Sequence, residues 1–362
     1  MASLTTESGS LTHHEPSGPL DLAALTSFPK VVLHEHLDGG LRPATIVELA
    51  DEVGYDGLPT SDPDELAAWF ATAVKSGGLP GYLATFDHTI AVMQTAAAIE
   101  RVAYEAVTDL AADGVIYAEI RFAPEHNTRL GLSLDDVIEA ALGGLERGRR
   151  SSNIGVGLIV DAMRNAARSR EAAQAAVRWK RAGVVGFDIA GPEAGFPPSD
   201  HREAFAFARA DGLGITIHAG EADGLASIAD ALHTCGAERI GHGVRIVDDI
   251  DGEVLGPLAT EIRDRQVVLE LCPRSNVDTG AVPSIAAHPI DRLLRLGFAV
   301  TVNCDNRLMS NTGPVVELGD LVAAFGWGPE EIRTVTQNAA GAVFASDIDR
   351  RALSERIASH PD

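Results

Sequence analysis

The stretch KVVLHEHL, residues 30–37, joins a run of β-branched residues to two histidines at alternate positions. Residues i and i+2 of a strand face the same side, so His34 and His36 point the same way and Glu35 points the opposite way. Two imidazoles gain nothing from being buried side by side without partners. The spacing therefore indicates a pair of metal ligands at the end of a strand.

Seven more runs rich in apolar and β-branched residues follow, each succeeded by turn residues and a helical pattern. From the second run onward they recur at roughly 25 to 40 residues, the length of a unit of strand, loop, helix and loop. This alternation, with no break in composition, predicts an α/β protein with a single (β/α)8 TIM barrel. The predicted strands are Lys30–Leu37, Val115–Ala123, Gly155–Asp161, Val184–Ala190, Gly214–Ala219, Arg239–Gly243, Val267–Cys272 and Ala299–Asp305.

Three segments between these strands carry clear helix signals. Ser133–Arg149 opens with SLDD, an N-cap pattern, while Arg168–Arg181 and Asp200–Ala210 each end just before a glycine. They are therefore expected to form helices of the outer layer of the barrel.

Residues 38–114, between the first two predicted strands, are too many for a simple connection. Their helical patterns cover Thr45–Val53, Pro63–Lys75 and Leu79–Ala112. An insertion of about residues 42–112 after the first strand lies at the carboxyl-terminal face of a barrel, where active sites are found. We expect it to form a lid or a pocket wall; the alternative is a helical elaboration that only enlarges the core.

The composition indicates one large domain, residues 21–362, preceded by a polar tail, residues 1–20. Hydrophobic residues make up 45% of the chain and charged residues 22%, as in ordinary globular proteins. The tail has no basic or apolar signal-peptide regions and is expected to be disordered. The remaining apolar runs are too short for a membrane span.

The net charge of −23 disfavours nucleic acid and anionic membranes as partners. A small-molecule partner is expected instead, and no oligomeric state is predicted. The three cysteines, Cys235, Cys272 and Cys304, are far apart and form no CxxC. They favour a reducing, cytoplasmic compartment over a disulfide framework.

Further candidate ligands occur at the ends of other strands. His218 ends the fifth predicted strand and Asp305 ends the eighth, so three imidazoles and a carboxylate meet at one face. Three nitrogens, one oxygen and an open position predict a catalytic zinc site, with iron or cobalt as alternatives. The fourth strand ends in FDIAG without a lysine that could bridge two ions, which favours one metal per chain.

Two more residues supply candidates for proton transfer. A zinc site lowers the pKa of bound water to about 7, so a neighbouring group must orient that water and take its proton. His242, on the sixth strand, is expected to be this orienting base, together with Asp305; the alternatives are a fourth nitrogen ligand or a structural residue. Glu221, three residues after His218 in HAGE, is expected to be a catalytic acid rather than a surface glutamate.

Seven ordered motifs resemble the adenosine deaminase family of amidohydrolase-like TIM barrels, most closely its bacterial members. They are HEHLDGGLRPATI (34–46), EIRFAPE (119–125), GFDIAGPE (186–193), IHAGE (217–221), RIGHG (239–243), LCPRSNVDTG (271–280) and NCDN (303–306).

The resemblance implies a role for each matching residue. His34, His36, His218 and Asp305 match zinc ligands. Glu221 matches the acid that protonates purine N1, and His242 matches the residue that orients the attacking water. The expected substrate-binding residues are His36, Asp38 toward the ribose 5′-hydroxyl, Gly191 as a backbone donor to purine N3, and Asn306 toward N7, where many members have aspartate.

The chain departs from the family pattern at two positions. Cys304 stands where threonine is usual, and its side chain should point away from the metal. Arg274 replaces a small or neutral residue, and it either faces solvent or recognises an anionic substituent.

The expected reaction is zinc-dependent hydrolytic deamination of adenosine, or 2′-deoxyadenosine, to the inosine product and ammonia. One alternative keeps the chemistry on 6-amino-6-deoxyfutalosine, adenine or a secondary-metabolite nucleoside. Another is a binding relative without turnover, which the retention of the acid, the base and all four ligands disfavours.

Overall fold

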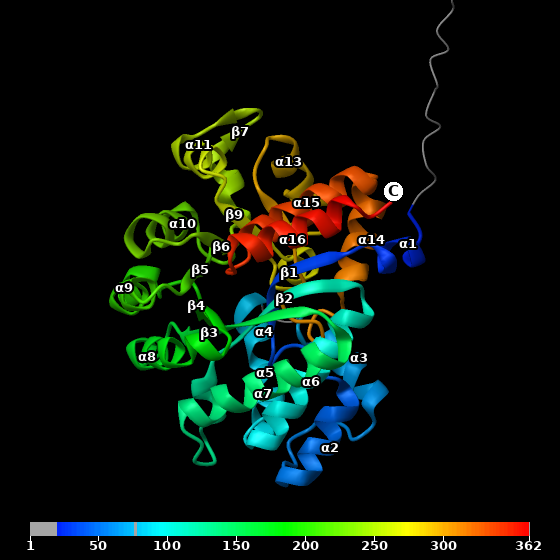
Figure 1. Ribbon diagram of the computed structural model, residues 1–362, viewed down its shortest axis with the longest axis vertical. Helices are drawn as coiled ribbons and strands as arrows, with labels where there is room; N and C mark the ends of the chain where they lie inside the picture. Colours follow the sequence, from blue (N-terminus) through cyan, green and yellow to red (C-terminus); the bar gives the residue numbers. More distant parts are fainter. Residues whose placement is uncertain (1–19, 76–77, 362) are drawn as a thin grey trace, which may run out of the picture.

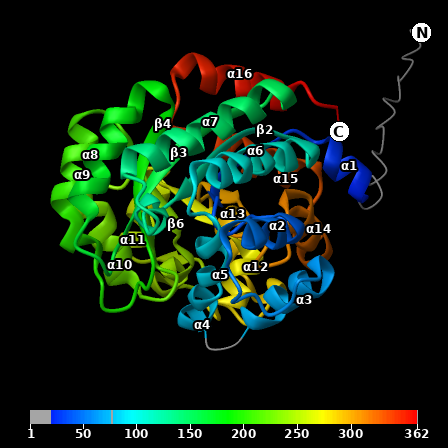
Figure 2. The same ribbon diagram turned by 90° about the horizontal axis from the view of Figure 1, so that it is seen from below.

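The computed structural model describes residues 20–75 and 78–361, so the predicted tail lies, except for Leu20, outside the described residues. An eight-stranded sheet, all parallel, runs in the order β1-β2-β3-β4-β5-β6-β9-β10, with helices outside it (Figures 1 and 2). This arrangement confirms the predicted barrel. Its strands are β1 Lys30–His36, β2 Val115–Phe122, β3 Gly155–Met163, β4 Val184–Ala190, β5 Gly214–Ala219, β6 Arg239–His242, β9 Val268–Leu271 and β10 Val300–Val302.

The barrel is closed where β1 meets the end of β10. The backbone N–H of His36 donates to the carbonyl of Asp305 at 2.7 Å, and the N–H of Asp305 donates to the carbonyl of His34 at 3.0 Å. The backbone bonds that close the barrel therefore bring together three predicted metal ligands from opposite ends of the chain. A small antiparallel hairpin, β7 (Ile250–Asp251) and β8 (Val254–Leu255), lies outside the barrel and was not predicted.

The outer layer contains the predicted helices and several more. α7 begins with the expected capping box, in which the Ser133 hydroxyl accepts from the Asp136 N–H and the Asp136 carboxylate accepts from the Ser133 N–H. The helices outside the insertion are α1 Leu22–Ser27, α7 Leu134–Ser152, α8 Ser169–Trp179, α9 Arg202–Ala210, α10 Leu225–Asp230, α11 Pro257–Asp264, α12 Pro273–Asp278, α13 Ile290–Arg295, α14 Pro314–Phe325, α15 Pro329–Ala342 and α16 Asp347–Ala358. Short 3-10 turns cover Pro124–Asn127, Lys180–Ala182, Pro198–His201, Val244–Asp249 and Ile285–Ala287, and one π turn covers Ala231–Cys235.

The insertion after β1 forms five helices in the lower half of Figure 1. They are α2 Pro43–Val53, α3 Pro63–Ala73, α4 Gly78–Ala84, α5 Phe86–Val92 and α6 Ala96–Ala112. The segment Leu79–Ala112 is thus three helices, because Thr95 caps a new one by accepting from the Ala98 N–H. α6 packs on α7 and β2 as an ordinary barrel helix. Within the described residues, no helix is long and apolar enough to cross a membrane.

Candidate active site

Two predicted site residues have a backbone conformation that L-residues rarely adopt. His242, at the end of β6, and Asp305, just after β10, both have φ of +61°. Such a conformation costs on the order of 1–3 kcal/mol and persists where the surrounding structure holds it. His242 ends β6 and Asp305 follows β10, so both lie at the carboxyl ends of barrel strands.

Four side chains at this mouth can each offer one atom to a common ion. The candidate ligand atoms of His34, His218, His242 and Asp305 all lie within 4.8 Å of one another. Nε2 of His34 is fully buried and has no hydrogen-bond partner, although it lies 3.4 Å from Oδ1 of Asp305. An unpartnered buried nitrogen aimed at a carboxylate and two imidazoles fits a divalent metal.

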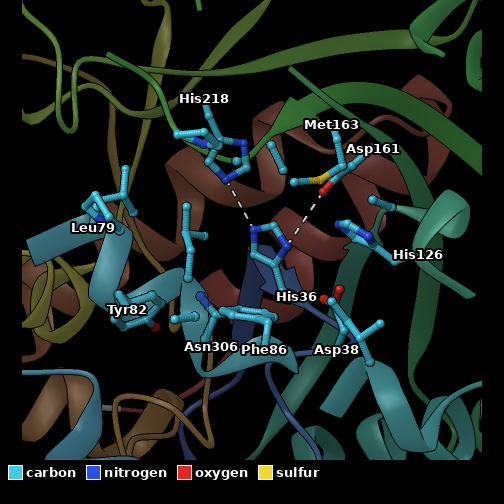
Figure 3. A pocket seen from close by; sticks show the side chains of 18 of the residues that line it. His36, Asp38, Leu79, Tyr82, Phe86, His126, Asp161, Met163, His218 and Asn306 are labelled. Carbon is cyan, nitrogen blue, oxygen red and sulfur yellow. Dashed lines mark hydrogen bonds and ion pairs between the residues drawn. The ribbon is translucent and has the colours of Figure 1, made fainter. Parts of the chain in front are cut away.

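His36 joins the same cluster from the cavity side (Figure 3). Its Nε2 lies 3.2 Å from Nε2 of His218 and 3.3 Å from Oδ1 of Asp305. Glu35, between the two histidines, points the opposite way as predicted, and its carboxylate accepts from Arg307 at 2.6 Å. Four imidazoles and one carboxylate therefore converge, one imidazole more than a three-nitrogen site requires.

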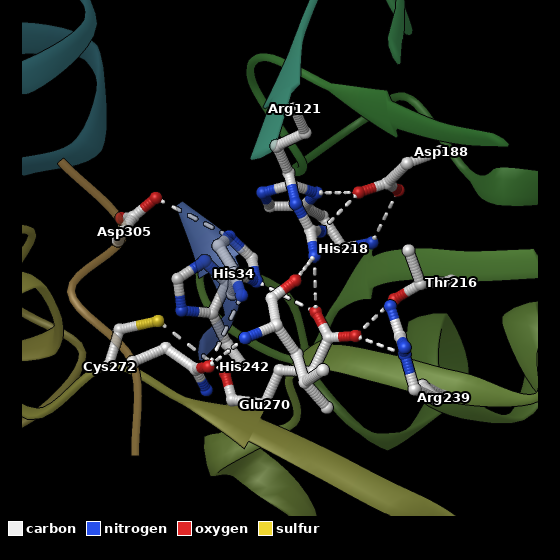
Figure 4. A network of polar contacts seen from close by, with 12 residues as sticks. His34, Arg121, Asp188, Thr216, His218, Arg239, His242, Glu270, Cys272 and Asp305 are labelled. Carbon is white, nitrogen blue, oxygen red and sulfur yellow. Dashed lines mark hydrogen bonds and ion pairs between the residues drawn. The ribbon is translucent and has the colours of Figure 1, made fainter. Parts of the chain in front are cut away.

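The groups behind the rings divide these four imidazoles into two kinds. Two have a buried carboxylate hydrogen-bonded at Nδ1, the third faces a buried Asp161 without a hydrogen bond (Figures 3 and 4), and the fourth has an amide. The contacts are His34 with Glu270 at 2.9 Å, His218 with Asp188 at 2.7 Å, His36 with Asp161 at 3.6 Å, and His242 with the Nδ2 of Asn276 at 3.0 Å. A carboxylate at Nδ1 holds the proton there and leaves the Nε2 lone pair free for a metal.

A buried arginine forms ion pairs with two of these carboxylates. Arg121 donates to Asp188 at 2.7 Å and to Glu270 at 2.8 Å, and all three side chains are fully buried (Figure 4). The sequence interpretation did not include these residues in the site. The available signal was a charged residue inside each of three buried strands: EIRF, GFDIA and VLEL. Such charges persist in a core when they are paired.

Glu221 is buried beside the cluster, with 8% of its surface exposed. Burial, and next the neighbouring Asp305, raise its pKa to about 7. One of its oxygens has no hydrogen-bond partner, and the other lies 3.7 Å from Nε2 of His242. Burial in turn lowers the pKa of His242 to about 4. Glu221 is therefore a carboxylic acid that holds its proton near neutral pH, beside a neutral imidazole.

The turn that carries Glu221 is held by another carboxylate, that of Glu193. Its oxygens accept from the backbone N–H groups of residues 220 to 223, at 2.6, 3.0, 2.7 and 3.0 Å, and from the Ser227 hydroxyl at 2.6 Å. Glu193 belongs to the AGPE motif, so two motifs far apart in sequence form one structure. The sequence interpretation did not give Glu193 this role.

A cavity of about 410 Å³ opens above the cluster (Figure 3). The insertion supplies an apolar wall that includes Leu79, Tyr82, Phe86 and Ile90. Except for His34, which lies beneath, the predicted site residues all line the cavity: His36, Asp38, Gly191, His218, Glu221, His242, Asp305 and Asn306. The structure thus brings together residues from several barrel strands and the insertion.

Two polar side chains that line this cavity each have an oxygen without a hydrogen-bond partner. Oδ1 of Asp38 and Oδ1 of Asn306 are buried without a hydrogen bond, and burial raises the pKa of Asp38 to about 7. Gly191 has φ of +98°, and a Cβ there would approach Cε of Met163 to 2.8 Å. Gly39 leaves room for Asn306, whose Oδ1 would lie 1.8 Å from an added Cβ. These features fit a polar ligand held close to the backbone.

The two departures from the family pattern lie outside this cavity. Cys304 is fully buried with a free thiol, and it does not line the cavity. Arg274 pairs with Asp320 at 2.6 Å and donates to the carbonyl of Asn311 at 2.8 Å. Its guanidinium is thus bound to protein partners, which removes the motive for an anionic substituent recognised at this residue.

An eight-stranded parallel barrel with a metal-binding group of histidines and an aspartate at its carboxyl end defines the class of metal-dependent TIM-barrel hydrolases. The chain belongs to the adenosine deaminase family, whose model matches residues 29–360. It is 54% identical over 346 residues to the adenosine deaminase of Mycobacterium ulcerans, covering 93% of this chain and 96% of the relative. It is 52% identical over 355 residues to that of Mycobacterium avium, covering 94% and 97%.

Solved structures of similar proteins share the architecture. Adenine deaminase from Arthrobacter aurescens superposes with a TM-score of 0.82 at 28% identity, covering 91% of this chain and 98% of that one. An amidohydrolase from Burkholderia ambifaria with bound Zn superposes with a TM-score of 0.79 at 25% identity, covering 96% and 97%. The barrel and its helical additions are thus similar over nearly the whole chain.

Proposed function

We propose that the protein deaminates adenosine, and 2′-deoxyadenosine, hydrolytically to the inosine product and ammonia. The observation that carries the proposal is the position of Glu221. A buried carboxylic acid that keeps its proton near neutral pH lines the same cavity as a metal-binding group. Protonation of a ring nitrogen next to the carbon under attack needs such an acid. The curated relatives that the chain matches over nearly their whole length are adenosine deaminases.

For the metal we propose one zinc ion held by His34, His36, His218 and Asp305. The carboxylates at Nδ1 of His34 and His218 support this choice, because they leave Nε2 of each ring free to coordinate. Nε2 of His36 lies 3.2 Å from Nε2 of His218 and 3.3 Å from Oδ1 of Asp305, within the same cluster. His242 lacks such a carboxylate and is assigned to the reaction instead. When bound, the ion supplies the Lewis acidity that makes water a nucleophile at neutral pH. Zinc is favoured over iron or cobalt because a related amidohydrolase contains it.

The substrate roles follow from the unpartnered polar groups of the cavity. Glu221 gives its proton to purine N1, and the N–H of Gly191 donates to N3. The Asn306 side chain can turn its NH₂ toward N7, since its present Oδ1 position has no partner. Asp38 accepts from the ribose 5′-hydroxyl. His36, a proposed zinc ligand, also lines the cavity and is proposed to contact the purine.

These assignments favour a nucleoside over a free base. Adenine alone would leave the buried carboxyl of Asp38 without a partner, which costs about 1–3 kcal/mol. Proton handling stays within the chain: His242 and Asp305 hold the attacking water, Asp305 accepts its proton, and Glu221 delivers the proton that purine N1 requires. The amino group then takes the proton held by Asp305 and leaves as ammonia, while the hydroxyl group gives its proton to Glu221 as the 6-oxo group forms.

Residues 21–362 are proposed to act as one catalytic domain. The helices α2 to α5 are proposed to close the cavity over the purine, because α4 and α5 supply its apolar wall. A reducing, cytoplasmic compartment is proposed because Cys235, Cys272 and Cys304 are all buried free thiols.

The test is a side-by-side measurement of ammonia release from adenosine, 2′-deoxyadenosine, adenine and 6-amino-6-deoxyfutalosine, with elemental analysis of the same protein. We expect the two nucleosides to give the highest kcat/KM and about one zinc per chain. A higher kcat/KM for adenine or the futalosine would reject adenosine as the substrate. A zinc-loaded protein inert on all four would reject the enzyme in favour of a binding protein.

A further inference from the structure

We propose that His288 and Asn276 act as positioning residues that fix the tautomer of His242, so that His242 presents an Nε2–H donor to the cavity. Neither residue lines the cavity. The proposal deepens the proposed function, since His242 is the residue assigned to hold water. The hydrogen bonds on which the proposal rests are nevertheless independent of which substrate the enzyme takes.

The direction of these hydrogen bonds is set by a backbone N–H, which can only donate. The backbone N–H of Ile290 donates to Nδ1 of His288 at 3.2 Å, so that nitrogen is an acceptor and carries no proton. The proton of the His288 ring is therefore on Nε2, which lies 3.1 Å from Oδ1 of Asn276. A flipped Asn276 amide would turn its NH₂ toward the Nε2–H of His288, so that two donors would face each other.

The direction of the next hydrogen bond, between Asn276 and His242, is fixed as well. With Oδ1 toward His288, Asn276 turns its NH₂ to Nδ1 of His242 at 3.0 Å. An amide NH₂ donates and does not accept, so Nδ1 of His242 is the acceptor. The neutral His242 ring then carries its proton on Nε2, the nitrogen that faces Glu221 at 3.7 Å.

Burial favours this arrangement of donors and acceptors over the reversed one. Asn276, His242 and His288 expose 0%, 1% and 3% of their surfaces, so water cannot replace a reversed donor or acceptor. Reversing one bond would leave a buried polar pair in conflict, which would destabilise the reversed arrangement. His242 lies on β6, Asn276 on α12 and His288 in the turn before α13.

These hydrogen bonds also distinguish His242 from the proposed metal ligands. A nitrogen that carries a proton cannot coordinate a metal, whereas His34 and His218 have carboxylates that hold the proton at Nδ1. His242 is therefore a donor to the oxygen of the attacking water. In this tautomer Nε2 cannot accept the proton of that water, which passes instead to the Asp305 carboxylate.

The test is nitrogen-15 NMR of the zinc-loaded full-length protein labelled at its histidines, with His242 assigned by its loss in His242→Gln. Long-range proton–nitrogen correlations distinguish a protonated ring nitrogen from an unprotonated one. We expect Nδ1 of His242 to be unprotonated and Nε2 protonated. In Asn276→Asp the carboxylate accepts from both rings, and the pattern of His242 should reverse.

Activity provides a second readout. We expect Asn276→Asp to lower kcat on adenosine about 10- to 100-fold, the usual effect of a group that orients an active-site histidine, while KM and zinc content stay close to wild type. His288→Gln keeps an N–H donor and should retain the tautomer and most of kcat, whereas His288→Leu should not. Asn153→Asp, at the exposed C-cap of α7, is the matched control for the charge change.

The proposal is overturned if wild-type His242 carries its proton on Nδ1, or if Asn276→Asp leaves the tautomer unchanged. Should Asn276→Asp not fold, the wild-type spectrum and the contrast between the two His288 variants decide. A wrong substrate assignment would appear as a failure in the ammonia measurements with the His242 spectrum as expected, so the two failures are distinguishable.

Discussion

Asp188 holds His218 by two bonds at once. Its Oδ2 lies 2.7 Å from Nδ1 of the ring and its Oδ1 accepts from the His218 backbone N–H at 3.1 Å, and no part of the carboxylate is exposed. A side chain on β4 therefore fixes both the orientation and the protonated nitrogen of a proposed ligand on β5.

Replacing Asp188 by asparagine should weaken zinc binding about 10- to 100-fold, because the amide no longer draws the ring proton to Nδ1. The fold should also lose stability, since Arg121 keeps only Glu270 as a buried ion-pair partner. Competition with a coloured chelator measures the affinity. Asp135→Asn, which breaks an exposed pair with Arg178, is the control and should bind zinc as wild type does. Equal zinc affinity in both variants would contradict the role of Asp188.

Glu221→Gln removes the proton that purine N1 needs and should lower kcat about 10²- to 10⁴-fold, with zinc content retained. In the wild type, kcat/KM should fall as the pH rises through about 7, where Glu221 loses its proton. Continuous absorbance assays of adenosine loss across pH provide the measurement. Glu203→Gln, in the first turn of α9, is the matched control. A wild-type rate in the Glu221→Gln variant would exclude Glu221 as the acid.

Gly191→Ala should cost about 1–3 kcal/mol of stability, because φ is +98° and the new methyl would meet Met163 at 2.8 Å. The KM for adenosine should rise as well, since the N–H proposed to face purine N3 would shift. Thermal unfolding and steady-state kinetics measure the two effects. Gly341→Ala, in α15 with nothing within 4 Å of an added Cβ, should be neutral or slightly stabilising. Similar losses in both variants would argue against a special conformation at Gly191.

Glu317 predicts a pH dependence of stability. Burial raises its pKa to about 8 from an ordinary value of 4.5, so the folded protein binds this proton more tightly than the unfolded chain. Stability from this group is therefore full at low pH and is lost as pH rises from 4.5 to about 8. The loss amounts to at most about 1.4 kcal/mol per pH unit.

Glu317→Gln keeps an oxygen for the Arg274 N–H, can turn its NH₂ to the Thr312 hydroxyl, which is able to accept, and has no proton to lose. Relative to wild type, the variant should gain stability as pH rises through this window, as measured by urea unfolding at several pH values. Glu330→Gln, in the first turn of α15, should show no such gain. Parallel pH profiles for wild type and Glu317→Gln would contradict the raised pKa.

The local patterns of the sequence determined the barrel and brought together the proposed metal ligands. Alternation in KVVLHEHL places His34 and His36 on one face whatever surrounds them, and strand ends in a closed parallel barrel must meet, which brings in His218 and Asp305. The eight strands agree with their predicted bounds to within a few residues. The helical stretch at 79–112 was predicted less well, because the chain breaks near Thr85, where no side chain caps the next helix, and at Thr95, where the break depends on a capping bond rather than on periodicity.

Tertiary structure alone decided what stands behind each ring. Glu270 reaches His34 from 236 residues away and Asn276 reaches His242 from 34, and no local pattern encodes which of them is a carboxylate facing a ring. The nitrogen that carries the ring proton depends on that partner, and a metal binds only the other nitrogen. The sequence could therefore gather the imidazoles at one face, whereas their division into three proposed ligands and one donor required the packed barrel.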